Sequence, residues 1–282
     1  MGSENERKDE MENKNGIIES EFTCQRDGLA IRGKMLVPSD AQDEKLPVAV
    51  VSHGFMSSWQ ESYPYAQALA DSGYAAFCFD FCGGGPESAS EGSTRDMSPL
   101  TEVEDLKAVV ACARGLDATL DEPVLLAGCS QGGFVSALTA AKLKDEVRGL
   151  ALIYPAFSIP DDSRHGRMLF MEFDPENVPD ELQCGPMALS SRYVLDVQEM
   201  DTYAVIAGYT GPVLIVHGDN DQAVDISYSY DAVKAYEDAG ASARLEVIEG
   251  GEHGWRDRQG TLDTEHLART QELVAEFAKA LA

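Results

Sequence analysis

Short runs of apolar residues alternate with amphipathic stretches along most of the chain. The apolar runs have the length of β-strands buried on both faces and lie at 47–52, 75–81, 124–127, 150–154, 213–216 and 245–248. Stretches with a helical period of apolar residues separate them, at 63–72, 99–114, 131–143, 228–239 and 265–281. Strands that alternate with helices predict an α/β fold with a mostly parallel central sheet and helices on both faces.

The N-terminal part departs from this alternation. Two β-rich runs, 17–24 and 29–37, flank the turn residues Arg26-Asp27-Gly28 and predict an antiparallel hairpin ahead of the parallel strands. Residues 1–15 are nearly all polar or charged, so we expect a disordered tail without the apolar run of a signal peptide. Since no stretch approaches the roughly 18 apolar residues of a membrane span, we expect no membrane association and a cytoplasmic location.

A second departure lies between residues 156 and 209. Four prolines divide this segment into short pieces, and no strand is evident in it. A connection of this length within a compact domain is often an active-site lid. We therefore expect a core made of residues 16–155 and 210–282 with an inserted cap subdomain at 156–209. An ordinary helical excursion without a role in substrate binding is the alternative.

Composition narrows the class of partner. The formal net charge of −27 argues against nucleic acid, because phosphate binding needs clustered lysine and arginine. The six cysteines include no CxxC pair and no Cys/His cluster at zinc spacing, so we expect packing residues, no disulfide and no metal.

The strongest chemical signal is the pattern Gly128-Cys129-Ser130-Gln131-Gly132. It follows the apolar run at 124–127 and precedes a helical period, so the serine is expected on a sharp strand-to-helix turn with its hydroxyl exposed. Glycines are needed on both sides because larger side chains would clash with the neighbouring strand and helix. Ser130 is therefore the candidate nucleophile.

A serine hydroxyl needs a base within hydrogen-bond reach, and five histidines are available, at 53, 165, 217, 253 and 266. His253 follows the last predicted strand in a glycine-rich loop and completes the chain order serine, aspartate, histidine. His217 precedes the acid candidates, which is the wrong order.

The third member must orient the imidazole and stabilise its cation. The loop at 217–224 reads HGDNDQAV and contains two competing aspartates. We favour Asp221, because its spacing reaches beyond the strand end towards the histidine loop. Asp219 is the alternative and could instead brace the turn, and Asp225 is a weaker candidate.

Negative charge on the substrate oxygen needs backbone N–H donors that already point at it. The residue after the nucleophile, Gln131, is expected to supply one. The turn after the strand at 47–52 is expected to supply the other, from Phe55 or alternatively Met56. The glycines at 83–85 lack phosphate-loop spacing and indicate a flexible turn.

With these pieces placed, the chain from about residue 17 to its end resembles the α/β-hydrolase family. It is most similar to bacterial cinnamoyl and feruloyl esterases. The resemblance is carried by HGF at 53–55, FDF at 79–81, TEVEDL at 101–106, GCSQGG at 128–133, HGDNDQAV at 217–224 and IEGGEHGW at 248–255. These motifs are specific for the superfamily but say little about the substrate.

The resemblance extends into the expected cap, through FDPENVP at 173–179 and Ser191-Arg192-Tyr193. In those esterases an aspartate and a tyrosine of the cap contact hydroxyl groups on the substrate's aromatic ring, and Asp162 and Tyr193 stand at the matching positions. A solvated aspartate and a half-buried tyrosine are the alternative. The run at 168–171 (MLFM) is more apolar than a polar phenol contact requires and leaves other aryl or alkyl esters open.

The resemblance implies ester hydrolysis through an acyl-enzyme, with a small-molecule ester as partner and no metal or organic cofactor. A serine peptidase of the acylaminoacyl-peptidase type and a non-catalytic binding protein on the same fold are the alternatives. Exposed apolar residues of the cap could support a homodimer.

Overall fold

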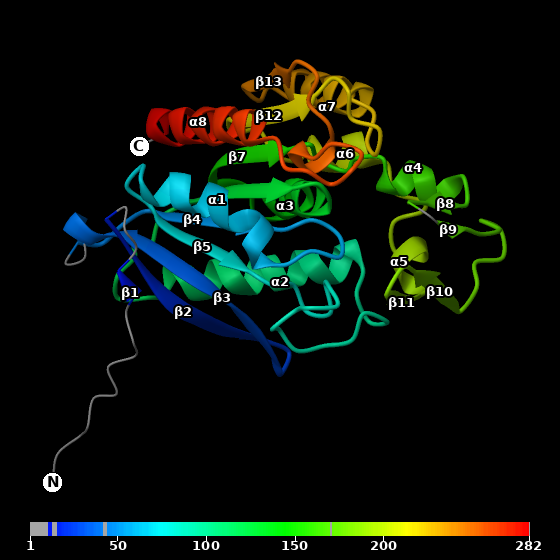
Figure 1. The fold of residues 1–282 in the computed structure, drawn as a ribbon, viewed down its shortest axis with the longest axis horizontal. Helices are drawn as coiled ribbons and strands as arrows, with labels where there is room; N and C mark the ends of the chain where they lie inside the picture. Colours follow the sequence, from blue (N-terminus) through cyan, green and yellow to red (C-terminus); the bar gives the residue numbers. More distant parts are fainter. Residues whose placement is uncertain (1–10, 13–15, 42–43, 170, 282) are drawn as a thin grey trace, which may run out of the picture.

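A nine-stranded sheet runs through the centre of the protein in the computed structural model, which describes residues 11–12, 16–41, 44–169 and 171–281 (Figure 1). Its strand order is β1-β2-β3-β5-β4-β6-β7-β12-β13. The strands from β5 to β13 pair in parallel, whereas β1, β2 and β3 pair antiparallel at one edge. The predicted hairpin and the predicted mostly parallel sheet are confirmed.

The strands of this sheet are β1 (Met11–Glu12), β2 (Ile17–Arg26), β3 (Leu29–Pro38), β4 (Val48–Ser52), β5 (Ala75–Phe79), β6 (Val124–Cys129), β7 (Val147–Ile153), β12 (Val213–Gly218) and β13 (Ala243–Ile248). The α-helices are α1 (Trp59–Ala70), α2 (Pro99–Arg114), α3 (Gln131–Leu143), α4 (Ile159–Arg164), α5 (Arg192–Leu195), α6 (Thr202–Ile206), α7 (Ser227–Asp238) and α8 (Thr264–Ala280). The described residues also form three short 3-10 helices, η1 (Ser39–Ala41), η2 (Lys144–Glu146) and η3 (His253–Trp255).

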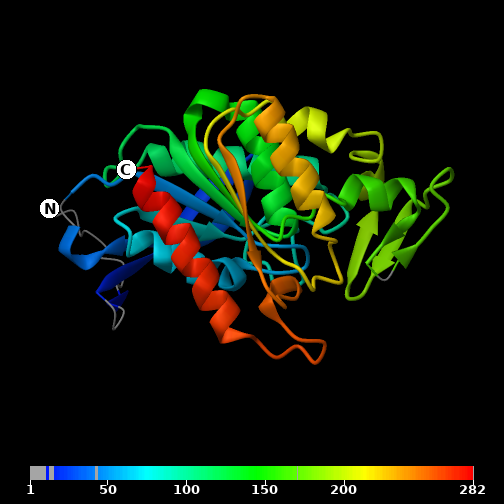
Figure 2. The same cartoon turned by 90° about the horizontal axis from the view of Figure 1, so that it is seen from above.

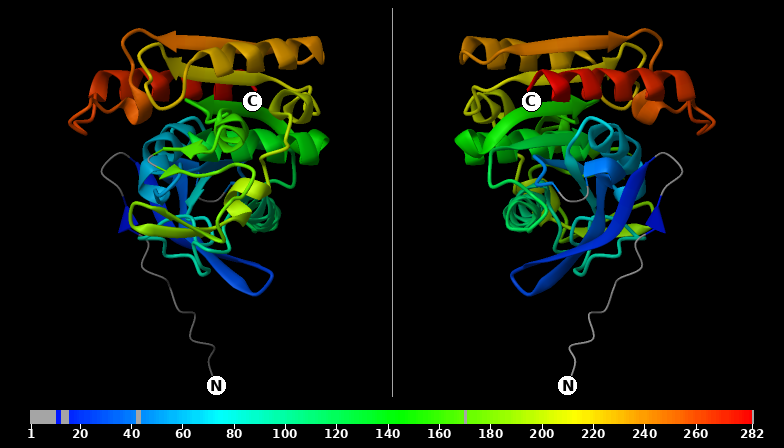
Figure 3. Two further views of the ribbon diagram at one scale, coloured as in Figure 1. Left: turned by 90° about the vertical axis from the view of Figure 1, so that its right-hand side faces the viewer. Right: turned by 90° about the vertical axis from the view of Figure 1, so that its left-hand side faces the viewer.

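Helices cover both faces of the sheet, as its buried strands require (Figures 2 and 3). Alternate side chains of β4 point into two separate cores: Val50 packs with residues of α2 and α3, and Val51 packs with residues of α1 and α8. Each fully buried valine or leucine stabilises such a core by about 1.5–3 kcal/mol. The sheet is thus a rigid platform, and its parallel strands end together along one edge.

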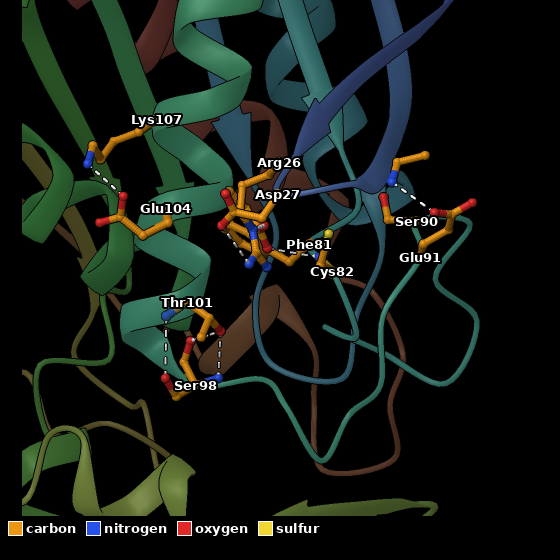
Figure 4. Close-up of polar contacts among 12 residues, drawn as sticks. Arg26, Asp27, Phe81, Cys82, Ser90, Glu91, Ser98, Thr101, Glu104 and Lys107 are labelled. Atoms are coloured by element: carbon orange, nitrogen blue, oxygen red, sulfur yellow. Dashed lines mark hydrogen bonds and ion pairs between the residues drawn. The ribbon is translucent and has the colours of Figure 1, made fainter.

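The N-terminus of α2 shows how local sequence sets a helix boundary. Ser98 accepts a hydrogen bond from the Thr101 amide and its own amide donates to Thr101 Oγ1, which forms a capping box (Figure 4). Pro99 then occupies the first helical position, where its missing N–H costs nothing. Further along α2, the buried Asp105 receives hydrogen bonds from Arg26 and the Cys82 amide and joins the helix to the hairpin and to the loop after β5.

The start of α1 was predicted too late. The sequence indicated residue 63, next to Pro64, but the helix begins at Trp59 and contains that proline in its interior. Ser58 precedes it without a side-chain cap, and the Trp59 amide instead donates to Asp80 Oδ1 at 2.7 Å. Because the cap comes from a residue 21 positions away, a local pattern could not reveal it.

The expectation that residues 156–209 contain no strand was wrong. They form two small antiparallel pairs, one of β8 (Arg167–Met168) with β9 (Met171–Glu172) and one of β10 (Glu181–Cys184) with β11 (Met187–Ser190). In the second pair, Leu182 and Cys184 alternate with exposed residues and are buried. These β-strands are short enough for the prolines around them to hide the alternation. The part from α4 to α5 projects beyond one end of the sheet (Figure 2).

Two expectations concern the chain as a whole. The predicted tail at 1–15 lies outside the described residues except for Met11–Glu12, which pair with β2. Among the described residues, no helix combines the length and the apolar composition needed to cross a membrane.

Candidate active site

Ser130 lies between the last residue of β6 and the first residue of α3, in a backbone conformation that residues with a side chain rarely adopt. Its φ and ψ angles are 51° and −117°. Strained conformations of this kind persist only where surrounding contacts enforce them, and they cluster at functional sites. Here the Ser130 amide donates to Ile153 O, and its carbonyl accepts from the Ala156 amide. The strand-to-helix turn predicted for Ser130 is therefore present.

The glycines on either side of this turn allow close backbone contact. A Cβ atom at Gly128 would lie 2.3 Å from Gly132 O, and one at Gly132 would lie 2.3 Å from His53 O. Both distances are far below any real contact of a Cβ atom. The tight turn therefore requires glycine at both positions, for the steric reason that the sequence suggested.

A continuous hydrogen-bonded path leads away from the Ser130 hydroxyl. His253 Nε2 lies 2.9 Å from Ser130 Oγ, and His253 Nδ1 lies 2.6 Å from Asp221 Oδ2. A carboxylate can only accept, so the Nδ1 atom carries the proton and Nε2 is left to accept the serine proton. The structure thus brings together three residues that lie far apart in the sequence, at the ends of β6 and β12 and in the loop after β13.

The Asp221 carboxylate is held by four donors. Oδ2 accepts from His253 and from His217 Nε2, and Oδ1 accepts from the amides of Ala223 and Val224 at 2.8 and 2.9 Å. Burial by itself would raise the pKa of this carboxyl, but the hydrogen bonds from His217 and His253 outweigh it and lower the pKa well below its usual value. Asp221 is therefore ionised at neutral pH.

His217 supports Asp221 instead of competing with His253 as a base. It is fully buried at the end of β12, and Ser229 Oγ lies 2.7 Å from its Nδ1. Its Nε2 faces two acceptors, Asp221 Oδ2 and Val224 O, each at 3.1 Å, so Nε2 carries a proton. The sequence excluded His217 as the base but did not predict this contact.

The other two aspartates of this loop have different partners. Asp219 Oδ1 accepts from the Gly250 amide at 2.6 Å and braces the turn, and Asp225 Oδ1 accepts from the Ser227 amide at the start of α7. The structure therefore joins Asp221 to His253 and leaves both alternatives in local structural roles.

Two backbone N–H groups beside Ser130 are free to bind a substrate oxygen. Within the described residues, the amides of Phe55 and Gln131 donate to no other group, and both residues line the same cavity as Ser130. His53 holds the Phe55 loop, because its Nε2 accepts from the Phe81 amide at 3.1 Å and its Nδ1 lies 2.7 Å from Gly54 O. Met56, the alternative donor to the substrate oxygen, has a left-handed backbone conformation with a φ angle of 58°.

The Gln131 side chain links the core to the 156–209 segment. Its Nε2 donates to the buried Glu102 of α2 at 2.8 Å, and its Oε1 accepts from the hydroxyl of Tyr193 in α5. Burial raises the pKa of the Glu102 carboxyl, which the hydrogen bond from Gln131 lowers only in part. This buried chain fixes the residue that follows the nucleophile, and the sequence gave no sign of it.

A cavity of about 1040 Å³ opens above Ser130 and His253. The 156–209 segment contributes Asp162, Met168, Leu169 and Tyr193 to its wall. Both cap residues expected at the substrate therefore face the cavity, although the Tyr193 hydroxyl already donates its proton to Gln131. Residue 170, in the apolar run noted in the sequence, lies outside the described residues. No group of three or more His, Cys, Asp or Glu side chains in the described part of the chain is arranged to hold a metal ion.

The cavity lining also contains residues that the sequence did not single out. The loop after His253 contributes Arg256, Asp257 and Arg258, all of them exposed. The sequence could have pointed to these residues, because two arginines lie close to His253 in a strongly acidic chain.

Comparisons with known proteins identify the family and the fold. A family model described as the alpha/beta hydrolase fold matches residues 47–183. The structure of Est1E from Butyrivibrio proteoclasticus with ferulic acid bound has 31% sequence identity and a TM-score of 0.80, and the match covers 91% of this chain and 97% of that chain.

More distant structures share the fold alone. The esterase Pf2001 from Pyrococcus furiosus has 16% identity and a TM-score of 0.65, with 94% of this chain and 93% of that chain covered. The esterase domain of a Rhodothermus marinus protein has 19% identity and a TM-score of 0.68, with 94% and 99% covered. No curated protein sequence matches the chain.

Proposed function

The chain belongs to the α/β-hydrolase family, and on that premise we propose that it is a serine carboxylesterase that hydrolyses small aromatic esters of the cinnamoyl or feruloyl type. The observation that carries the proposal is the path from Ser130 Oγ through His253 to Asp221, with distances of 2.9 and 2.6 Å. Free amides beside the serine and a large cavity above it add the other two requirements of acyl transfer.

The proposed reaction proceeds in two steps. His253 Nε2 takes the proton of Ser130 as its oxygen attacks the ester carbonyl, and the amides of Phe55 and Gln131 bind the negative oxygen that forms. His253 then gives that proton to the alcohol oxygen, the carbon–oxygen bond breaks, and the acyl group stays on Ser130. Water repeats the sequence and releases the acid, while Asp221 stabilises the histidine cation in both steps.

We assign substrate recognition to the 156–209 segment, acting as a cap over residues 16–155 and 210–282. Asp162 and Tyr193 line the cavity and both offer oxygen atoms that can accept a hydrogen bond from a phenol. Tyr193 is restricted to accepting, because its proton goes to Gln131. Met168 and Leu169 supply the apolar surface on which an aromatic ring would lie. The ferulic acid bound in the Est1E structure supports a ligand of this kind.

A profile of hydrolysis rates tests the proposal. Methyl ferulate, methyl caffeate, methyl cinnamate, simple acyl esters and aminoacyl amides should be compared, with the aromatic esters expected to have the highest kcat/KM. Ser130→Ala should abolish turnover of all of them, whereas Ser72→Ala, two residues after the end of α1 and outside the cavity lining, should leave it unchanged.

Each alternative has its own outcome in the same profile. Preference for the aminoacyl amides would replace the esterase proposal with a peptidase. Absence of turnover, together with no labelling by a fluorophosphonate, would indicate a non-catalytic protein on the hydrolase fold.

A further inference from the structure

We propose that Arg256 and Arg258 form a subsite for a carboxylate on the alcohol part of the ester, so that the preferred substrates carry a negative charge on the group that leaves first. This inference rests on the proposed ester hydrolysis and adds a substrate class to it.

Arg256 and Arg258 differ from the other arginines in their ion pairing. Ten of the twelve arginines in the described part of the chain have an acidic oxygen within 4.0 Å, and the two that have none are Arg256 and Arg258. With 49 aspartates and glutamates in the chain, a neighbouring carboxylate is easy to provide. Two guanidinium groups without an acidic partner, two positions apart, are therefore unusual in this chain. They are available to bind an external anion.

The two arginines also lie at the candidate active site. Both arginines line the cavity that contains Ser130 and His253, and they belong to the loop between η3 and α8. The 156–209 segment contributes other residues to the same cavity. Arg256 is held there by a hydrogen bond from its guanidinium to Gly260 O at 3.0 Å, while Arg258 makes no side-chain contact of this kind in the described structure. The planar guanidinium presents paired N–H donors that match a carboxylate.

The acidic residues of the same cavity are engaged elsewhere. Asp257, between the two arginines, turns its carboxylate to the amides of Gln259 and Thr261, both at 2.8 Å. Glu252 accepts a hydrogen bond from Asn220, and Asp162 lies against Arg167. The cavity wall therefore carries three arginines and three acidic residues, whereas the chain as a whole carries a net charge of −27.

The position of the two arginines close to His253 indicates which part of the substrate they contact. His253 returns its proton to the alcohol oxygen, so the alcohol must pass close to the loop that bears the histidine. Arg256 and Arg258 follow His253 by three and five residues on that loop. The acyl group is left to the wall formed by Asp162, Met168 and Tyr193.

A matched pair of esters tests the subsite. 4-Carboxyphenyl butyrate and 4-carbamoylphenyl butyrate have the same shape and differ in one negative charge. We expect the wild-type protein to hydrolyse the carboxylate with a kcat/KM roughly 3- to 10-fold higher, the size expected for exposed charge pairs, and we expect the preference to shrink at high salt.

Three variants assign that preference to the two arginines. Arg258→Gln removes no internal hydrogen bond and should lower the preference, and the double variant Arg256→Gln/Arg258→Gln should abolish it while leaving hydrolysis of the amide-bearing ester near its wild-type rate. Arg269→Gln in α8, which removes the same charge outside the cavity lining, should leave the preference unchanged. An equal rate for the two esters in the wild-type protein, or a preference that survives in the double variant, would overturn the subsite.

A binding measurement separates this inference from the esterase proposal. The proposed function is decided by the hydrolysis profile with the cinnamoyl-type esters. If neither butyrate is hydrolysed, calorimetry with 4-hydroxybenzoate and 4-hydroxybenzamide tests the subsite alone. Tighter binding of the benzoate by the wild-type protein, lost in the double variant, supports an anion subsite, and equal binding of the two compounds contradicts it.

Discussion

Replacing Gly132 with alanine tests whether the turn at Ser130 is held by backbone contact. The new Cβ atom would lie 2.3 Å from His53 O and 2.6 Å from Ser52 O, whereas ordinary contact begins at 3.4 Å. The first residues of α3 and the end of β4 must therefore separate by about 1 Å, because neither contact is with a flexible side chain. Such a shift moves Ser130 relative to the amide of Phe55.

The size of the effect follows from that displacement. A misplacement of about 1 Å at a reacting group can reduce the rate by about 100-fold, and inserting a methyl group into a packed site typically costs about 1–3 kcal/mol of stability. We expect Gly132→Ala to lower kcat/KM for a p-nitrophenyl ester by about that factor. Urea denaturation should show a corresponding loss in the free energy of unfolding.

Gly115→Ala is the matched control. This glycine ends α2 with a φ of −83°, and a Cβ atom there would meet its nearest neighbours at an ordinary 3.5 Å. Its activity should equal that of the wild-type protein. If Gly132→Ala also keeps wild-type activity and stability, close backbone contact does not hold the nucleophile, and the steric reasoning is wrong.

Substitutions at three further residues probe the groups around this turn. Because the pKa of Asp221 is lowered on folding, its carboxylate stabilises the protein above the unfolded pKa, near 4, and this contribution is lost as the pH falls through the folded pKa. The difference in unfolding free energy between the wild-type protein and Asp221→Asn should therefore shrink in acid. A difference that stays constant with pH would contradict the assignment. His217→Phe removes a hydrogen bond to that buried carboxylate and should lower kcat/KM by about 10-fold. His217→Gln keeps a donor and should recover part of the lost activity. If both variants have wild-type kinetics, His217 does not support the site. Tyr193→Phe leaves the buried Gln131 oxygen without its donor and should lower the free energy of unfolding by about 1–3 kcal/mol in urea, so unchanged stability would argue against that contact.

The fold could be predicted from the sequence because the patterns that indicate its strands and helices are local. The buried strands are continuous apolar runs, and the caps of α2 lie within three residues of each other, at Ser98 and Thr101. The positions of Ser130 and His253 followed from a turn motif and from chain order. Residues close in sequence determine the strands, the cap and the turn at Ser130, whereas His253 lies 123 positions from Ser130 and was found by chain order.

The features that the sequence missed depend on residues far apart in the chain. α1 begins at Trp59 because Asp80 supplies its cap, and the Gln131 side chain is fixed by Glu102 and Tyr193, 29 and 62 positions away. No local pattern encodes such contacts, since each becomes visible only when the sheet brings its strands together. The small strands of the 156–209 segment were missed because strands of two to four residues give too little alternation to recognise.

The most direct test of the account is to identify the residue that carries the acyl group during turnover. The protein should be mixed with a slowly hydrolysed aromatic ester, quenched in acid, digested and examined by mass spectrometry. The account predicts one acyl adduct per chain, on Ser130, and none in the Ser130→Ala variant. Turnover that continues in that variant, or an adduct that maps to another residue, would contradict it.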